Sequence, residues 1–414
     1  MAAKAWHLKT RLMVTTVSSY TEARNRALIA DGYDGVVRVV VGNMYGTGVL
    51  LFDGKAVLTA AHLFNGSSGS ANVIFESRSG VQTIASSQVV INPDYNNVNN
   101  NSDMALVWLS QDAPVAAERF GIYRSGNEVG QTFTMVGYGT PGTGNSGTLS
   151  DFKEVPVRVK ANNQFDTDIA PLNRFFSESG QWETNNGKQL VADFDNGVSL
   201  NDALGALVGI NSLGLGSSEG LISKGDSGGP AFIGSLVAGI ASYTGRLSAA
   251  GAVPDIDNTS NSSFGEVAVW QRVSVYQQWI DQAMRLRYES PPATQAAVQK
   301  SVNEGNSGTT PVYFWVQLNG YRIDPNIIVS VDYKTRNGTA LSGQDYIATQ
   351  GTLKIYPNES HALVAVEIIA DIVPELDETF YLDVFNPVNA GFGEGLVQLT
   401  AVRTIVNDDG WFWG

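Results

Sequence analysis

The stretch Gly225-Asp226-Ser227-Gly228-Gly229-Pro230 decides how this chain is interpreted. It places a serine on a tight turn between glycines, which accept backbone conformations that other residues avoid. Such a turn exposes the Ser227 hydroxyl and aims the backbone N–H groups of Gly225 and Ser227 at the place where an oxyanion would develop. Taken alone, the stretch is equally typical of an ordinary glycine-rich turn, so its meaning depends on other residues.

Two residues upstream supply the partners that a serine nucleophile needs. His62, one of three histidines, ends the run Val57-Leu58-Thr59-Ala60-Ala61-His62, where a strand passes into a turn. A histidine in this place can act as a general base. Asp103 precedes the apolar run 104–109, and a buried carboxylate there can hold the imidazole tautomer and offset the imidazolium charge. Each residue alone is a weak signal, because most such histidines and aspartates have ordinary roles.

The order of these residues along the chain separates two classes of hydrolase. The order is His62, Asp103, Ser227. In α/β-hydrolases the histidine follows the serine, and the only histidine after Ser227 is His361, in the second half of the chain. The sequence therefore argues against a lipase or esterase.

Together the three stretches resemble the trypsin family, whose signatures T-A-A-H, D-[IM]-A-L and G-D-S-G-G-P stand at 59–62, 103–106 and 225–230. The resemblance covers residues 33–285. It implies two packed antiparallel β-barrels and peptide-bond hydrolysis through an acyl-enzyme. It also implies a catalytic triad of His62, Asp103 and Ser227, an oxyanion hole from Gly225 and Ser227, and no cofactor for catalysis.

The resemblance also implies a specificity pocket. The residue six positions before the nucleophile lies at the base of that pocket in the family, and here it is Leu221. The family's S-W-G segment corresponds to Ser242-Tyr243-Thr244, and Ala268 corresponds to the opposite wall. Leucine at the base and threonine in place of glycine imply a preference for small or medium apolar residues before the cleaved bond. The alternative is that the loop 245–265 reshapes the pocket.

Activation follows the family less closely. Trypsin-type enzymes pair a freed Ile-Val N-terminus with the acid before the nucleophile, here the structural acid Asp226. The chain has no Ile-Val-Gly-Gly segment, and cleavage after Arg26 would free Ala27-Leu28-Ile29, a poor match. Residues 18–31 are instead predicted to form a helix capped by Ser18 or Ser19. Both alternatives stay open: Asp226 has another partner and no cleavage is needed, or cleavage activates the enzyme.

Pattern and turn residues predict an all-β chain, with strands at 36–40, 49–52 and 105–108 among others. A closing helix carries Tyr276, Trp279, Ile280 and Met284 on one face. The expected organisation is an N-terminal extension with a short helix at 1–32, a trypsin-like domain at 33–287, a linker at 288–297, a second β-domain at 298–410 and an aromatic tail at 411–414.

The second domain contains acidic turns within a strand-rich pattern. They are Val302-Asn303-Glu304-Gly305, the segment 337–346, Glu375-Leu376-Asp377-Glu378-Thr379-Phe380 and Asn407-Asp408-Asp409. This region resembles a Calx-β domain, an immunoglobulin-like β-sandwich whose loops at one end can gather carboxylates around Ca²⁺. By resemblance the candidate ligands are Glu304, Asp345, Asp371, Glu375, Asp408 and Asp409. The acids are fewer than in the strongest binders of the family, so a purely structural sandwich with solvated acidic turns stays open. The stretch 193–197, Asp-Phe-Asp-Asn-Gly, is interpreted as a turn rather than a metal-binding loop.

Composition narrows the remaining classes. The 414 residues carry a net charge of −14 without a basic cluster, which argues against a nucleic-acid partner. The absence of cysteine excludes disulfides, thiolate zinc sites and a cysteine nucleophile, and it favours a bacterial relative. No apolar run reaches the ~18 residues that span a bilayer, and the N-terminus lacks a secretory signal pattern.

Three functions are consistent with the sequence. The leading one is a serine endopeptidase acting on protein or peptide substrates. Its sandwich would contribute calcium-dependent stability or contact with a cell surface or matrix, and the calcium module favours a secreted or cell-surface location. The alternatives are a calcium-dependent adhesion or binding protein with a vestigial protease domain, and an intracellular processing protease with one dedicated substrate.

Overall fold

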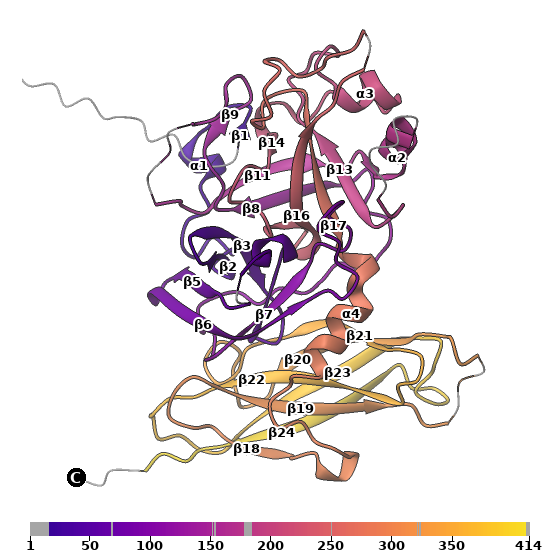
Figure 1. Cartoon of the computed structure of the whole chain (residues 1–414). Coiled ribbons are helices and arrows are strands. Elements are labelled where there is room, and N and C mark those ends of the chain that lie inside the picture. Colours follow the sequence, from indigo (N-terminus) through magenta and orange to yellow (C-terminus); the bar gives the residue numbers. More distant parts are fainter. Residues whose placement is uncertain are drawn as a thin grey trace, which may run out of the picture. The chain divides into compact units, whose positions relative to one another are not determined.

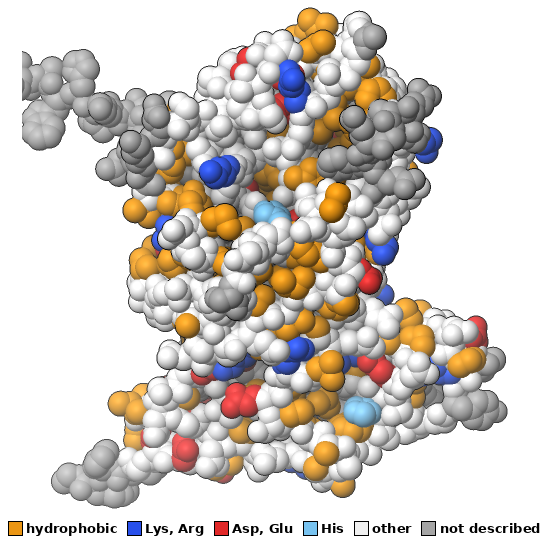
Figure 2. All heavy atoms as spheres, viewed as in Figure 1, with side chains coloured by type: hydrophobic (Ala, Val, Ile, Leu, Met, Phe, Trp, Pro, Cys, Tyr) orange, Lys and Arg blue, Asp and Glu red, His pale blue; other side chains and the backbone are white. Residues whose placement is uncertain are grey.

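The computed structural model describes residues 16–410 except 68, 151, 153–154, 178–183, 250, 321 and 323. The chain is mostly β, as expected (Figure 1), and divides into two compact units. Unit 1 comprises residues 1–50, 57–110 and 122–276, and unit 2 comprises 51–56, 111–121 and 277–414. No helix in the described ranges is long and apolar enough to cross a membrane. Lys and Arg side chains on the face seen in Figure 2 are scattered rather than gathered in one patch.

Six strands of unit 1 form a closed barrel in the order β2-β3-β4-β7-β6-β5. They are β2 (Val36–Val41), β3 (Met44–Leu50), β4 (Ala56–Thr59), β5 (Asn72–Ser77), β6 (Gly80–Ile91) and β7 (Ala105–Leu109). The predicted strands at 36–40 and 105–108 are confirmed, and the one at 49–52 ends early, at Leu50. β4 and β7 are buried throughout, because both of their faces are covered. A short 3-10 helix, Ala61–Phe64, follows β4 directly.

A seven-stranded sheet forms the second half of unit 1, in the order β11-β8-β15-β16-β17-β13-β12. Its strands are β8 (Thr132–Gly137), β11 (Val159–Gln164), β12 (Thr167–Asp168), β13 (Gln189–Asp193), β15 (Pro230–Ile233), β16 (Leu236–Arg246) and β17 (Glu266–Arg272). Three buried aromatic rings lie in the core of this sheet. Phe133 stacks on Phe165 with 4.0 Å between the ring centroids, and Trp270 packs edge-on against Phe133 with 5.0 Å between the centroids. Together, barrel and sheet give the double-barrel architecture expected from the sequence.

The N-terminal segment departs from the expected helix at 18–31, which is wrong. Helix α1 spans only Glu22–Asn25, and Thr21, rather than Ser18 or Ser19, caps it by accepting a hydrogen bond from the Arg24 N–H. The helix ends because the chain joins the sheet: Arg26 is extended and forms a bridge to Val159, the first residue of β11. Backbone pairing of this segment, which includes a hydrogen bond of 3.2 Å from the Ala27 N–H to the Arg158 carbonyl, therefore outweighs the weak helical pattern.

A small four-stranded sheet lies beside this segment, in the order β10-β9-β1-β14. It contains β1 (Thr16–Val17), β9 (Gly142–Thr143), β10 (Gly147–Thr148) and β14 (Gly220–Leu221). Farther along, the buried Arg158 guanidinium pairs with the Asp34 carboxylate and donates to the carbonyls of Val36, at 3.3 Å, and Glu76, at 3.2 Å. These contacts fix the N-terminal segment between barrel and sheet.

Further helical segments precede the sandwich. α2 (Ala170–Ser177) and α3 (Ala203–Val208) were not anticipated from the sequence, and a 3-10 turn spans Gly216–Ser218. The predicted closing helix is confirmed as α4 (Val273–Arg285). Tyr276, Ile280 and Met284 on its apolar face are at most 6% exposed.

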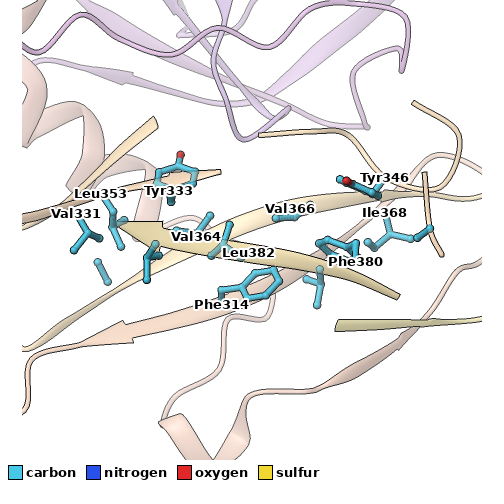
Figure 3. Packing of buried hydrophobic residues seen from close by; sticks show 14 of the residues in the cluster. Phe314, Val331, Tyr333, Tyr346, Leu353, Val364, Val366, Ile368, Phe380 and Leu382 are labelled. Carbon is cyan, nitrogen blue, oxygen red and sulfur yellow. The ribbon is translucent and has the colours of Figure 1, made fainter. Parts of the chain in front are cut away.

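Unit 2 contains a β-sandwich. One sheet has the order β18-β24-β23-β20-β21 and the other pairs β19 with β22. The strands are β18 (Ser301–Asn303), β19 (Thr309–Gln317), β20 (Val329–Asn337), β21 (Gln350–Ile355), β22 (His361–Ile369), β23 (Glu378–Val388) and β24 (Gln398–Val406), and a 3-10 turn at Gln295–Ala297 precedes them. Apolar side chains alternate along the strands and meet between the sheets, as Phe314 and Phe380 do in Figure 3. Within the same unit, Arg119 forms a bidentate ion pair with Glu367 of β22, at 2.8 and 2.9 Å.

Candidate functional site

The structure brings His62, Asp103 and Ser227 together in unit 1. His62 Nε2 lies 2.8 Å from Ser227 Oγ, and His62 Nδ1 lies 2.7 Å from Asp103 Oδ2. His62 stands on the short helix after β4, Asp103 precedes β7, and Ser227 precedes β15. The imidazole is positioned to accept the serine proton at one nitrogen while its other nitrogen donates to a carboxylate.

Asp103 is fully buried and receives more than one hydrogen bond. The His62 backbone N–H donates to Oδ1 at 2.8 Å, and the Ser242 hydroxyl donates to Oδ2 at 2.5 Å. Ser242, assigned to the specificity pocket from the sequence, therefore also supports the triad.

The loop before Asp103 is held by two amide side chains that the sequence did not single out. Gln189 Nε2 and Gln271 Nε2 donate to the Asn100 carbonyl at 3.0 and 2.8 Å. Gln189 lies on β13 and Gln271 on β17, which are paired residue to residue at these positions. No local sequence signal marks these two residues, because their role exists only once the two strands are side by side.

The nucleophile loop has the backbone that its glycines predict. Gly225 has φ +104° and Gly228 has φ +83°. A Cβ on Gly228 would come within 2.3 Å of the Thr47 carbonyl oxygen, so only glycine fits. Among the described residues, no partner accepts a hydrogen bond from the backbone N–H of Gly225 or of Ser227. Both N–H groups are therefore candidates for binding an oxyanion.

Asp226 is satisfied by neighbours in the folded chain. One carboxylate oxygen accepts from the Gly139 N–H at 2.8 Å, and the other accepts from the Ser223 N–H at 2.8 Å and its hydroxyl at 3.2 Å. Because these donors are internal, the carboxylate is held without an N-terminus freed by cleavage.

The remaining pocket candidates are divided between two apolar clusters. Leu221 and Ala268 are fully buried in the cluster that contains Trp270, and Thr244 pairs with Ala268 across β16 and β17. Tyr243 packs against the other cluster and donates from its hydroxyl to Gln189 Oε1 at 2.9 Å. The surroundings of Leu221 are thus apolar.

Several of the acidic residues of the sandwich lie close together. Burial, together with repulsion from Asp371, Glu375, Asp409 and Asp345, raises the pKa of Glu304 to about 7. The side-chain Oδ2 of Asp409 is buried without a hydrogen-bond partner in the described part of the chain.

Glu378 and Asp408 differ from what the six predicted calcium ligands led us to expect. Carboxylate oxygens of Asp345, Glu375 and Glu378 lie within 4.8 Å of one another, and Glu378 was not among the predicted ligands. Its position in the E-x-D-E stretch was a signal that could have identified it. Asp408 accepts a hydrogen bond from the Gly305 N–H at 3.0 Å and so closes the turn that carries Glu304.

Comparison with known families matches residues 32–223 to the trypsin family and residues 299–409 to the Calx-beta domain. The first match includes His62 and Asp103 and ends before Ser227, so the assignment of the serine rests on the geometry above. The second match includes all six candidate calcium ligands.

Curated relatives match only short parts of the chain. The sodium/calcium exchanger Calx of Drosophila melanogaster is 36% identical over 91 residues, 21% of this chain and 9% of that protein. Sodium/calcium exchanger 2 of Homo sapiens is 32% identical over 93 residues, 19% of this chain and 10% of that protein. The adhesion G-protein coupled receptor V1 of Danio rerio is 37% identical over 82 residues, 20% of this chain and 1% of that protein. This chain spans a tenth or less of these relatives.

Among solved structures, similarity is found to neuropsin, a serine protease expressed in the limbic system of mouse brain. The TM-score is 0.45 and the identity 20%, covering 63% of this chain and 98% of the other.

Proposed function

Because the chain carries a trypsin-family domain followed by a Calx-beta domain, we propose that it is a serine endopeptidase. The observation that carries this proposal is the continuous series of hydrogen bonds from Asp103 through His62 to Ser227. The free N–H groups of Gly225 and Ser227 lie beside the end of that series.

In the proposed reaction, Ser227 Oγ attacks the carbonyl carbon of the cleaved peptide bond while His62 Nε2 takes the serine proton. The carbonyl oxygen becomes an oxyanion that the N–H groups of Gly225 and Ser227 stabilise. His62 then gives its proton to the leaving amine, which leaves an acyl-enzyme. Water repeats the sequence, with His62 again as the base, and releases the acid.

Asp103 acts through His62. Its carboxylate accepts from Nδ1, which keeps Nε2 unprotonated and able to accept from the serine, and it stabilises the imidazolium that forms. Burial of Asp103 strengthens this interaction, because water does not compete for the carboxylate.

Labelling by a fluorophosphonate probe tests the assembled site. We expect the full chain to be labelled without prior cleavage, because Asp226 is held by Gly139 and Ser223. Intact mass of the labelled species identifies Ser227 occupancy on the uncut chain, and the Ser227→Ala variant is the control.

Two other labelling results would contradict the proposal in different ways. Labelling that appears only after trimming near Arg26 would mean a zymogen and would contradict the internal role of Asp226. Absence of labelling before and after trimming, with and without calcium, would overturn the endopeptidase and favour a calcium-dependent binding protein.

The apolar surroundings of Leu221 support a preference for small or medium apolar residues before the cleaved bond. A series of peptides that differ only at that position measures it as kcat/KM. We expect alanine and valine to exceed lysine by at least tenfold, because an unpaired ammonium beside buried apolar side chains costs more than about 1.4 kcal/mol. A preference for lysine would contradict the assignment of Leu221 to the pocket.

The residues of the sandwich fit a calcium ion, and we extend the proposal to it. Glu304, Asp345, Glu375 and Glu378 would hold the ion through carboxylate oxygens, which Ca²⁺ prefers. The buried, unpartnered Asp409 Oδ2 is a further donor. The bound ion would neutralise these carboxylates and order their loops, which supports the sandwich and not the reaction.

A further inference from the structure

A second group of carboxylates lies in unit 1, away from the triad and the sandwich. Oxygens of Asp193, Asp195 and Asp202 lie within 4.8 Å of one another, and all three side chains are at most 2% exposed. Successive side chains of an extended chain alternate between its two sides. Asp193 and Asp195 therefore share one side, while Phe194 packs into the apolar cluster on the other, against Phe264 at 4.6 Å.

Two oxygens of this group lack any partner. Asp193 Oδ1 and Asp195 Oδ1 are buried and accept no hydrogen bond from the residues that the structure describes. Leaving a buried charged oxygen unsatisfied is costly, so such atoms are rare in native proteins unless something else occupies the space. Both orphaned oxygens belong to side chains whose carboxylates converge.

The remaining oxygens of Asp193 and Asp202 are held in place by backbone donors of the surrounding loop. Asp193 Oδ2 accepts from the Leu204 N–H at 2.8 Å. Asp202 accepts from the N–H groups of Gly205, at 2.6 Å, and Ser212, at 3.2 Å. The carboxylates of Asp193 and Asp202 are thus fixed by backbone donors that leave further lone pairs free.

Glu219 adds a further carboxylate at the edge of the group. Its Oε1 accepts from the Asp195 N–H at 2.7 Å, and a Cβ on Gly214 would lie 1.8 Å from its Oε2, so the loop passes very close. No Lys or Arg in the described ranges forms an ion pair with any of these acids. The negative charge is left without a protein counter-charge.

We propose that Asp193, Asp195 and Asp202 bind a calcium ion in a buried site of unit 1. The donors are oxygen only, which suits a hard cation and not zinc, since zinc sites favour His and Cys. Ca²⁺ takes 6–8 oxygens at 2.3–2.6 Å, whereas Mg²⁺ usually keeps several waters and few carboxylates. The stretch 193–197, taken from the sequence as a plain turn, would then be the ligand-bearing end of β13.

The electrostatics agree with the geometry. Burial, followed by repulsion from Asp193 and Glu219, raises the pKa of Asp195 to about 9. Burial also raises the pKa of Glu219 to about 7. Both causes follow from the geometry, since buried carboxylates lie close together here without a counter-charge among the described residues.

The test uses the full chain with Ser227→Ala, which prevents self-cleavage. Calcium is removed with a chelator, restored, and counted per chain by elemental analysis after gel filtration. The double variant Asp193→Asn/Asp195→Asn is compared with the sandwich variant Asp345→Asn/Glu378→Gln and with the combination of both. We expect the first variant to lose one calcium ion per chain relative to the parent, and the sandwich variant to keep that ion.

Thermal unfolding supplies a readout that is independent of the count. In the absence of calcium, the Asp193→Asn/Asp195→Asn variant should be at least as stable as the parent, because the amides remove buried charge. Added calcium should raise the melting temperature of the sandwich variant by several degrees and leave the combined variant unchanged.

Three results would overturn the buried site. One is an unchanged calcium count in Asp193→Asn/Asp195→Asn, and another is a sandwich variant that holds no calcium even though its sheet content is intact. The third is a melting temperature of the sandwich variant that is the same with calcium, magnesium or chelator. That result is expected if the carboxylates of unit 1 only share protons. Since the sandwich variant retains all the unit 1 acids, the second result is decisive even where the Asp193→Asn/Asp195→Asn chain fails to fold.

Discussion

Replacing Ser227 with alanine is expected to lower kcat by about 10⁶-fold, because the acyl-enzyme cannot form and its partner His62 has no proton to move. The residual rate, about 10³–10⁴ above that in water, would come from the oxyanion groups and substrate binding. The Ser227→Ala chain should bind an uncleavable peptide with an unchanged dissociation constant, since the hydroxyl contributes little to ground-state binding.

Single-turnover hydrolysis of a peptide ester measures this change, with calorimetric binding of an uncleavable peptide as the companion. A His62→Ala variant is the matched comparison and should lose nearly as much. When residues act as one unit, the second removal in Ser227→Ala/His62→Ala adds almost nothing. A variant that keeps most of the rate without Ser227 would show that another group is the nucleophile.

Replacing Asp103 with asparagine is expected to lower kcat by about 10⁴-fold while the fold is kept. Asp103 now accepts three hydrogen bonds, from the His62 backbone N–H, His62 Nδ1 and the Ser242 hydroxyl. An amide offers one acceptor oxygen and one donor group. The NH₂ of the introduced amide would therefore face a donor, and the imidazole would adopt the tautomer with its proton on Nε2. That nitrogen could no longer accept from Ser227.

The rate of fluorophosphonate labelling measures the same loss without a substrate, because labelling needs the activated serine. Ser242→Ala is the control, since it removes one donor and leaves the contact between Asp103 and His62. We expect about a tenfold decrease there, from a hydrogen bond to a charged group worth about 1.5 kcal/mol. Equal losses in the two variants would mean that Asp103 serves the packing of its loop and not the tautomer of His62.

His62, Asp103 and Ser227 could be selected as candidates from the sequence because their local backbone is encoded locally. Glycines at 225 and 228 permit the positive φ values of the nucleophile loop. The apolar runs before His62 and after Asp103 are buried strands, β4 and β7. Short patterns of this kind carry their own geometry, and the order of the three stretches predicted that His62, Asp103 and Ser227 act together.

Local sequence pattern alone could not show that the helix predicted at 18–31 is limited to Glu22–Asn25. Its residues have helical spacing, yet Arg26 forms a bridge to Val159, far along the chain, and the helix ends at Asn25. Local preference is worth a few tenths of a kcal/mol per residue, and the hydrogen bonds that pair this backbone with the segment before and at the start of β11 exceed it. Local pattern therefore loses wherever a distant strand competes for the backbone.

The sequence by itself determined the all-β class and the trypsin-like and Calx-beta regions, and it predicted His62, Asp103 and Ser227 as candidate catalytic residues and the acidic turns of the sandwich as candidate ligands. Only the tertiary structure decided what holds them: Ser242 and the His62 N–H on Asp103, Gly139 and Ser223 on Asp226, and the convergence of Asp193, Asp195 and Asp202. The difference is physical. Strand pattern and turn chemistry depend on neighbours in the chain, whereas hydrogen bonds and repulsion between buried charges depend on which distant segments the folded sheets bring within a few ångströms.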